Sequence, residues 1–252
     1  MAVKARMGRA SLWRAKHWVA SLLAITFFFS IDCHGAERID EVIAAILHNY
    51  ESVVDYQCRL TVLSYLGNKR EERIINFYFK KPKLIRMDIL KGTRPGDSGS
   101  IGVYKGGDKV TGRRGGLLSG IVIKVSKENP LVTTIRGVGL HESDLETVFD
   151  QLAFYKAKGR IEFRDAGSSY AFTCTARNPA ENEGISKDLV WIDSKNFLIT
   201  RNERYEGDRL VQAASWGEYI VNAGLPEELF DVKFDVGTLG ERGIPILSQK
   251  AD

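Results

Sequence analysis

The chain has 252 residues, of which 44% are hydrophobic and 27% charged, with a formal net charge of +4. This composition fits one ordinary globular domain with a substantial core. The first 36 residues hold five of the 36 Lys and Arg but only one of the 32 Asp and Glu, which leaves 31 of each charge in the remainder. Nucleic-acid binding is therefore not indicated, because no basic excess remains to contact phosphates.

The N-terminal segment, residues 1–36, has the layout of a secretory signal peptide. A basic start precedes an apolar run from Val19 to Ile31, and small residues follow in Cys33-His34-Gly35-Ala36. This order is typical of an exported protein, and the apolar run is too short to span a bilayer comfortably. Two alternatives stay open: a lipoprotein acylated at Cys33, although Asp32 stands directly before it, and an uncleaved N-terminal anchor.

Hydrophobic periodicity predicts two helices. One precedes the first run of strands, and the other lies between the first run and the second. Apolar residues from Ile39 to Tyr50 recur at three- and four-residue steps, as in an amphipathic helix over 38–52. The sequence Ser143-Asp144-Leu145-Glu146 is a capping box. We expect it to start a second helix at residue 143, with Ser143 as N-cap, that ends at Gly159.

Around these helices, β-branched and aromatic runs are separated by Pro, Gly and Asp turns. Spacings of about eight to twelve residues favour an antiparallel meander over parallel βαβ units. A helical turn at 225–230 and a last strand at 232–236 complete a single domain over residues 37–239, and a flexible tail over 240–252 follows it. The other predicted strands are 54–66, 71–80, 83–90, 100–105, 109–113, 121–126, 160–166, 169–177, 187–193, 197–206 and 209–222.

Two cysteines follow the leader, Cys58 and Cys174, each in phase with apolar neighbours on a predicted strand. An oxidising compartment would allow a disulfide between them. Because the neighbours that share a strand face with each cysteine are apolar, two separate buried thiols are favoured.

Reactive side chains do not occur at the spacing of a known catalytic motif. The cluster His141-Glu142-Ser143-Asp144 offers acid–base or metal chemistry, but a helix cap explains it better. The loop from Arg94 to Gly99 lacks the spacing of a phosphate-binding loop. We therefore predict a protein that is not an enzyme and that has no catalytic residue, no cofactor and no metal site.

Four structural motifs follow one another along the chain. They are the strand-Lys-Pro-strand corner from Phe77 to Met87, the hairpin Val103–Val110, the strand Leu189–Asp193 that leads to Arg201, and Leu-Pro-x-x-Leu-Phe at 225–230. In this order they resemble the LolA/LolB-like periplasmic lipoprotein carriers, and among these the DUF1571 family. The resemblance implies an α+β, mainly antiparallel fold: a strongly curved, incomplete β-barrel of about eleven strands, covered by helices.

The resemblance also implies a periplasmic carrier of a lipid or a lipidated protein, with transient membrane contact. A lipid that crosses an aqueous compartment needs an apolar container, because exposing a chain of about sixteen carbons costs roughly 12 kcal/mol. The open alternative is that the helices fill the half-barrel and leave no cavity. Candidate lining residues, on the more apolar phase of each strand, are Leu60, Val62, Ile75, Phe77, Phe79, Ile85, Met87, Ile89, Val103, Phe172, Val190, Ile192, Ile199 and Trp216.

Three basic residues are further candidates. Carriers of this type commonly place an Arg before the corner proline as a latch for the helical lid, and here that residue is Lys81, which offers fewer directed donors. Arg113 and Arg114 are candidates for contact with a lipid headgroup or a partner, unless they form an ordinary solvated turn. A second function also stays open: an envelope-stress or assembly factor that binds a protein partner through the same half-barrel.

Signal-peptide cleavage after Gly35 or Ala36 would release a protein that begins at Ala36 or Glu37. We expect this protein to fractionate with soluble periplasmic material, and N-terminal sequencing of that fraction measures its first residue. A protein acylated at Cys33, or a membrane-bound protein that retains residues 1–30, would contradict the prediction.

Overall fold

The computed structural model describes residues 38–118 and 120–251. The signal peptide predicted for residues 1–36 therefore lies outside the described residues. Within the described part of the chain, no helix is long and apolar enough to cross a membrane.

The chain divides into two compact units, residues 1–45 and residues 46–252. The described part of the first unit is a helical segment that continues to residue 51 in the second unit, close to the predicted end at 52. In the second unit, Ile46 is buried, and the ring of Tyr50 packs edge-on against Phe149 with 5.2 Å between centroids. The end of this helix therefore belongs to the core of the second unit.

The second unit is built on one antiparallel sheet of 11 strands, in the order β6-β5-β4-β3-β2-β1-β11-β10-β9-β8-β7. Two meanders, β1 to β6 and β7 to β11, are joined where β1 pairs with β11, with Leu60 opposite Trp216. The end strands β6 and β7 are not neighbours in the described sheet, so the barrel is incomplete. The strands are β1 (Asp55–Leu66), β2 (Lys69–Lys80), β3 (Leu84–Gly92), β4 (Ile101–Tyr104), β5 (Lys109–Arg113), β6 (Val122–Ser126), β7 (Gly159–Asp165), β8 (Ser169–Ala176), β9 (Lys187–Asp193), β10 (Ile199–Glu206) and β11 (Arg209–Val221).

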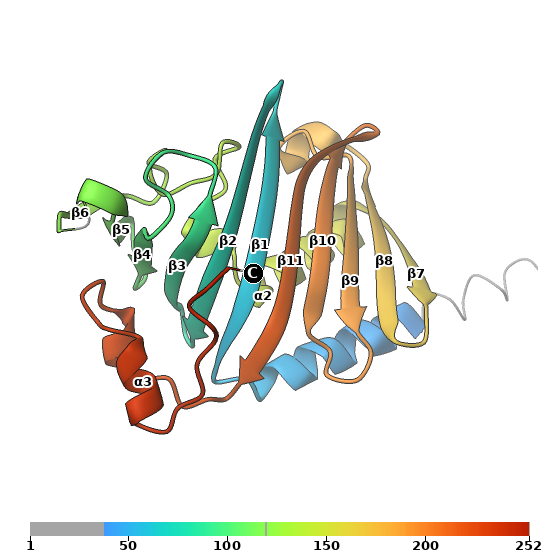
Figure 1. Ribbon diagram of the computed structural model, residues 1–252. Helices are drawn as coiled ribbons and strands as arrows, with labels where there is room; N and C mark the ends of the chain where they lie inside the picture. Colours follow the sequence, from blue (N-terminus) through green and yellow to red (C-terminus); the bar gives the residue numbers. More distant parts are fainter. Residues whose placement is uncertain (1–37, 119, 252) are drawn as a thin grey trace, which may run out of the picture. The chain divides into compact units, whose positions relative to one another are not determined.

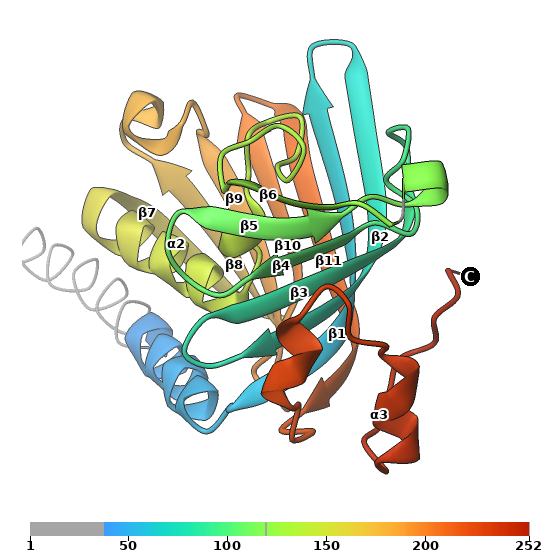
Figure 2. The same cartoon turned by 90° about the vertical axis from the view of Figure 1, so that its left-hand side faces the viewer.

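The sheet is strongly curved, and α2 (Leu145–Lys158) lies on one of its faces. Figure 2 shows β3, β4 and β5 running across the view while β1 and β2 run up it, and Figure 1 shows α2 behind the strands. We call the face that carries α2 the inner face. The predicted fold class, an incomplete antiparallel barrel with helices, is confirmed. The other helical elements are α3 (Gly237–Glu241), η1 (Gly116–Leu118), η2 (Leu140–Glu142), η3 (Pro179–Asn182) and η4 (Glu227–Phe230).

The N-terminus of α2 is capped by Asp144, so the prediction of Ser143 as N-cap is wrong. The Asp144 side chain accepts a hydrogen bond from the Thr147 N–H at 2.9 Å, whereas Ser143 ends η2. A carboxylate at this position also faces the positive end of the helix dipole. The apolar face of α2 is formed by Leu145, Val148, Phe149, Leu152 and Tyr155.

Gly159 joins α2 directly to β7. Its φ is −140°, so the helix does not end in a left-handed residue. A Cβ at this position would lie 2.5 Å from the Thr175 carbonyl oxygen and 2.9 Å from the Tyr155 ring. The predicted helix end at Gly159 is confirmed, and the physical reason is the close approach of β8.

Eleven predicted strands lie within two residues of their expected bounds, but the strand predicted at 232–236 is wrong. The Asp231 side chain accepts a hydrogen bond from the Lys233 N–H at 2.9 Å. Aspartates that bind the backbone two residues ahead favour turns over strands. The apolar alternation that suggested a strand still reflects burial, since Val232 and Val236 both lie in an apolar cluster.

Period-two alternation assigns the side chains of β1 to opposite faces. Tyr56, Cys58 and Leu60 share the inner face, and Gln57 lies on the outer one. Cys58 and Cys174 are both free and buried, which confirms the prediction of separate thiols. Burial raises the pKa of the Cys58 thiol.

The outer face of β2, β3 and β4 is covered by the segment after β11. Beneath this segment lies Arg86, which is only 1% exposed and pairs with Asp88 at 2.7 Å. Its Nη1 donates to the carbonyl oxygens of Leu229, Asp231 and Phe234, at 2.8, 3.0 and 3.2 Å. The apolar cluster around it consists of Tyr78, Val103, Leu225, Leu229, Phe230, Val232, Val236 and Leu239.

The end of the chain also lies on the outer face. Gln57 Nε2 donates to the Pro245 carbonyl oxygen at 2.6 Å, and Asn76 Nδ2 donates to that of Ser248 at 3.1 Å. Leu247 is buried. We expected a flexible tail here because the segment has no periodicity. The groups that bind it come from strands 172 to 188 residues earlier.

Replacing Arg86 by Met should lower the free energy of unfolding by about 3–5 kcal/mol, because the buried Asp88 carboxylate and three carbonyls lose their partner. Urea unfolding measures the change. The matched control is Arg160→Met, since Arg160 is 77% exposed and pairs with Glu162, and we expect a change within about 0.5 kcal/mol. Similar losses in both variants would contradict a clamp role for Arg86.

Candidate ligand-binding cavity

The inner face carries a cavity of about 560 Å³. Leu60 on β1 lies opposite Ile75 on β2 and Trp216 on β11. Alternate residues of these neighbouring strands therefore present one continuous apolar surface. The floor contains five of the predicted lining residues: Leu60, Val62, Ile75, Met87 and Trp216.

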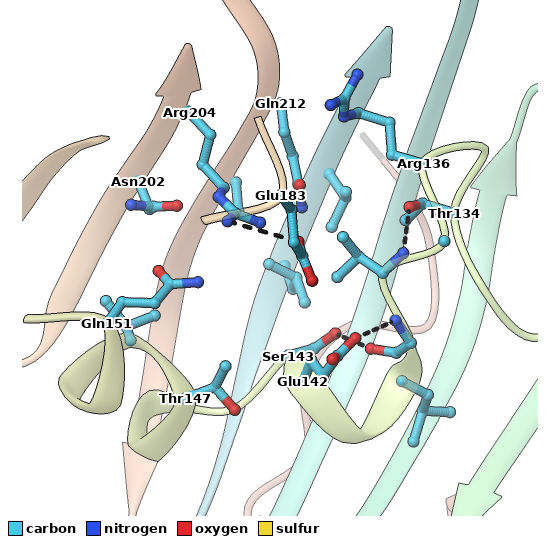
Figure 3. A pocket seen from close by; sticks show the side chains of 18 of the residues that line it. Thr134, Arg136, Glu142, Ser143, Thr147, Gln151, Glu183, Asn202, Arg204 and Gln212 are labelled. Atoms are coloured by element: carbon cyan, nitrogen blue, oxygen red, sulfur yellow. Dashed lines mark hydrogen bonds and ion pairs between the residues drawn. The ribbon is translucent and has the colours of Figure 1, made fainter. Parts of the chain in front are cut away.

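The roof and part of the walls come from connecting segments and α2, none of which we predicted as part of the site (Figure 3). A Cβ at Gly102 on β4 would lie 2.8 Å from Leu140 Cδ1, so glycine lets η2 approach the sheet. The roof and wall residues outside the sheet are Val132, Thr134, Arg136, Gly137, Val138, Gly139, Leu140, Glu142, Ser143, Thr147, Val148, Gln151, Phe154, Glu181, Asn182, Glu183 and Ile185.

A buried ion-pair cluster lies at the edge of this roof. Arg73 Nε on β2 lies 3.1 Å from Glu71 Oε1 and 2.9 Å from Asp97 Oδ2, and all three side chains are at most 10% exposed. Burial raises the pKa of Glu71, and the positive charge of Arg73 opposes that shift. Buried ions need further hydrogen bonds to offset their desolvation.

The main chain of the roof supplies such bonds. Glu71 Oε2 accepts from the Ile135 N–H at 2.9 Å. The Thr133 carbonyl oxygen accepts from Arg94 Nη2 at 2.8 Å and from Arg73 Nη2 at 3.5 Å. Charge-assisted hydrogen bonds therefore tie the roof to β2.

One wall of the cavity is polar. Asn202 and Arg204 on β10 share the inner face with Gln212, because Arg204 pairs with Gln212 in the β10–β11 register. Arg204 lies between two carboxylates, with Nε 3.5 Å from Asp188 Oδ1 and Nη2 3.8 Å from Glu183 Oε2. Burial raises the pKa of Asp188, and Arg204 opposes that shift.

The segment 141–144 binds its own backbone. Glu142 Oε2 accepts from the Gly139 N–H at 2.7 Å, and Asp144 caps α2. Among the residues that the structure describes, no group of three or more His, Cys, Asp and Glu could hold a metal ion.

Three other predicted lining residues, Phe77, Phe79 and Ile85, lie in the core outside the cavity. The rings of Phe77 and Phe79 stack on Tyr56, with centroids 5.8 and 5.0 Å away. The Tyr56 hydroxyl oxygen accepts from the Leu145 N–H at 3.3 Å. The start of α2 fills the inner face here.

Four predicted lining residues of the second meander are also core, whereas Trp216 lies on the cavity floor. Phe172, Val190, Ile192 and Ile199 are at most 1% exposed. α2 is anchored to this part of the sheet by the Tyr155 hydroxyl, which donates to Asp188 Oδ2 at 2.9 Å. The alternative of a filled half-barrel therefore describes part of the inner face in both meanders, and the cavity lies over another part, to which β10 and β11 also contribute.

Two further predicted lining residues lie outside the cavity. Ile89 is half-buried and does not line the cavity. Val103 lies in the apolar cluster of the outer face, so its assignment to the inner face is wrong. The inner positions of β4 are Gly102 and Tyr104, which pair with Met87 and Ile85, and the more apolar phase of this short strand is the outer one.

Lys81, the predicted latch, contacts the end of the helix at residues 38–51. Its Nζ donates to the carbonyl oxygens of Tyr50 and Glu51 at 2.7 and 3.1 Å and lies 4.4 Å from the centre of the Tyr50 ring. Carbonyls at a helix C-terminus lack partners within the helix, and the dipole favours a cation there. Release of this helix as a lid remains a prediction.

Arg113 and Arg114 lie outside the cavity lining. Arg113 shares the outer face with Asp88, where its charge opposes the rise of the Asp88 pKa caused by burial. Arg114 donates to the Pro95 carbonyl oxygen. Their contact with a headgroup or partner remains a prediction about that surface.

The polar wall was missed although the sequence contains a signal for it. Gln212 stands four residues before Trp216, so it shares a face with a residue that we did assign to the cavity. Gln151 gave no such signal, because its position depends on where α2 lies on the sheet.

Several solved structures are similar to this chain. An uncharacterized conserved protein from Thermus thermophilus matches with a TM-score of 0.46 and 13% identity over 77% of this chain and 92% of that one. A DUF1329 family protein from Desulfovibrio piger matches with 0.42 and 14% over 76% and 95%. A LolA superfamily protein from Nitrosomonas europaea matches with 0.37 and 12% over 75% and 96%. Likenesses at this level do not identify a function.

No protein-family model matches the chain, and no curated protein matches it in sequence. Membership of the DUF1571 family therefore stays a prediction.

Replacing Lys81 by Met should speed amide exchange in residues 46–51 by roughly tenfold or more, because the helix end loses a charged donor worth about 1.5–3 kcal/mol. Hydrogen exchange followed by mass spectrometry measures this. In the control, Lys80→Met, exchange in the helix should not change, since Lys80 Nζ donates to the Leu225 carbonyl oxygen. Unchanged exchange in Lys81→Met would show that this contact does not hold the helix.

Proposed function

We propose that this protein is a non-enzymatic binding protein whose cavity takes the apolar part of a lipid or of a lipidated protein. The observation that carries the proposal is the cavity of about 560 Å³ whose floor contains Leu60, Ile75 and Met87. A domain normally fills such a surface with its own side chains, as this one does around Phe77, Phe172 and Val190. The apolar floor is suited to the chain of such a ligand, whereas the roof and walls add polar and charged side chains, among them Arg136, Glu142 and Arg204.

The size of the cavity supports a small apolar occupant. Its volume of about 560 Å³ lies within the range of about 300–1,000 Å³ for small-molecule sites. Burial of each CH₂ group contributes about 0.8 kcal/mol, so even part of an acyl chain would bind appreciably. The volume disfavours the second candidate, a factor that binds a protein partner here, unless that partner inserts one side chain or a short segment.

The leader predicted over residues 1–36 supports a periplasmic location for this function. A container for acyl chains has a clear use between two membranes, where a lipid would otherwise face water. Loading and release would then need transient contact with a membrane.

Replacing Val62 by Trp should lower the affinity for a neutral fluorescent acyl probe by roughly tenfold or more, because the larger side chain occupies the cavity. Val62 is only half-buried, so its enlargement should leave the fold intact. Fluorescence titration measures the affinity. The control is Thr61→Trp, one residue away on the opposite face, which should bind the probe like the unsubstituted protein.

Mass spectrometry of extracts from the same purified proteins identifies the native occupant. Lipid in the unsubstituted protein and in Thr61→Trp, with little in Val62→Trp, would support the proposal. Equal probe binding by Val62→Trp and Thr61→Trp would remove the cavity as the binding site.

A further inference from the structure

Arg204 on the polar wall is held by charge rather than by short hydrogen bonds. Its side chain is only 10% exposed, and it lines the cavity. Nε lies 3.5 Å from Asp188 Oδ1, and Nη2 lies 3.8 Å from Glu183 Oε2. Arginine usually binds a carboxylate at about 2.7–2.9 Å, so neither carboxylate accepts a short hydrogen bond from this guanidinium.

The other arginines of the cavity differ in this respect. Among the described lining residues they are Arg73 and Arg136. Arg73 Nε donates to Asp97 Oδ2 at 2.9 Å, and Arg136 Nη2 donates to Glu206 Oε1. Both arginines therefore bind carboxylates of the fold directly, and Arg204 is the lining cation that is available to a ligand.

The two carboxylates near Arg204 have different surroundings. Asp188 is 1% exposed and accepts a hydrogen bond from the Tyr155 hydroxyl at 2.9 Å, so it belongs to the core. Glu183 is 77% exposed and lines the cavity. Figure 3 shows its side chain beside Arg204, with a dashed line between them. Asp188 is therefore the structural counter-charge of Arg204, and Glu183 is a second carboxylate on the cavity side.

The contact between Arg204 and Glu183 costs little to replace. Ion pairs that involve exposed side chains contribute little to stability, because water screens them. Glu183 also has a φ of 54°, in the left-handed region where Gly and Asn are more usual. The local conformation therefore gives no reason for a Glu at this position.

An anionic group of a ligand would gain more from Arg204 than Glu183 does. Two of its oxygens can accept parallel N–H bonds from the planar guanidinium, and such charge-assisted bonds are roughly twice as strong as neutral ones. Exchange of one singly charged anion for another leaves the net charge near Arg204 unchanged. A cationic head would have to pair with the exposed carboxylate of Glu183, where it gains little.

We infer that Arg204 binds the anionic head of the ligand, a carboxylate or a phosphate, and that Glu183 holds this place when no ligand is bound. The head oxygens accept hydrogen bonds from the Arg204 Nη1 and Nη2 groups, Glu183 moves into water, and the chain lies over the apolar floor. This inference rests on the proposed function and adds the charge of the head. A fatty acid and a lipid phosphate share this chemistry.

The test measures displacement of a neutral fluorescent acyl probe by ligands that share one chain and differ in the head. A fatty acid and a monoalkyl phosphate are anionic, a methyl ester is uncharged, and an alkyl trimethylammonium is cationic. We expect the better of the two anionic ligands to bind roughly tenfold more tightly than the methyl ester. The cationic ligand should bind no more tightly than the ester.

Substitution of both partners tests the site. Glu183→Gln removes the competing carboxylate and should raise the affinity for the anionic ligand by roughly threefold, with no change for the methyl ester. Arg204→Met should lower the anionic affinity to that of the ester. Because Arg204→Met also removes the counter-charge of Asp188, circular dichroism checks its fold. The matched control is Glu162→Gln, an exposed carboxylate 3.3 Å from Arg160 and outside the cavity lining, which should bind every ligand as before.

Three results would overturn the inference and leave the proposed function standing. They are equal affinities for the anionic ligands and the methyl ester, tighter binding of the cation, and an anion preference that folded Arg204→Met retains. An anionic affinity that does not rise in Glu183→Gln, or that rises equally in Glu162→Gln, would also overturn it, even if Arg204→Met does not fold.

The remaining outcomes concern the ligand and the proposed function. A preference for the fatty acid supports a lipid carboxylate as ligand, and a preference for the alkyl phosphate supports a lipid phosphate. Failure of the probe and of every ligand to bind the unsubstituted protein would overturn the proposed function itself.

Discussion

The cavity depends on charges that are buried at one end of β2. Removing Glu71, Arg73 and Asp97 from water costs several kcal/mol per ion unless other bonds offset the loss. Two of the offsetting bonds go to the main chain of the roof, at Ile135 and Thr133. The roof therefore cannot sink onto the floor without leaving buried charges unpaired, and a segment that is tied at its edge leaves space beneath it.

The inner face of the sheet forms core in one region and a cavity floor in another, because different elements cover it along the sheet. A helix of 14 residues, such as α2, is about 21 Å long, whereas an eleven-stranded sheet is roughly 50 Å wide. Where α2 lies against β8, Phe172 and its neighbours become core. Where a connecting loop lies over β1 to β3, the same alternation of apolar residues forms the floor of a cavity.

The central strands are covered on both faces, which matters for any interpretation of their sequences. On β2, Ile75 to Phe79 are all buried, since the C-terminal segment lies on the outer face and α2 and the roof lie on the inner one. Arg86 shows how the outer cover is held: one guanidinium binds three carbonyls of a segment more than 140 residues away. Continuous burial blurs the period-two pattern, and this explains why the more apolar phase of β4, with Val103, belongs to the outer face.

The sequence by itself determined the eleven strands and the second helix up to Gly159, and it favoured two separate thiols, because alternation, capping and turn residues act over a few neighbouring positions. Only the tertiary structure decided which apolar residues face a cavity, since Leu60 and Phe77 have the same local pattern and differ in what lies above them. The roof, the polar wall and the ordered segment around Leu247 likewise depend on partners that are distant in sequence. Burial of a side chain depends on the element that covers it, and a local pattern does not contain that element.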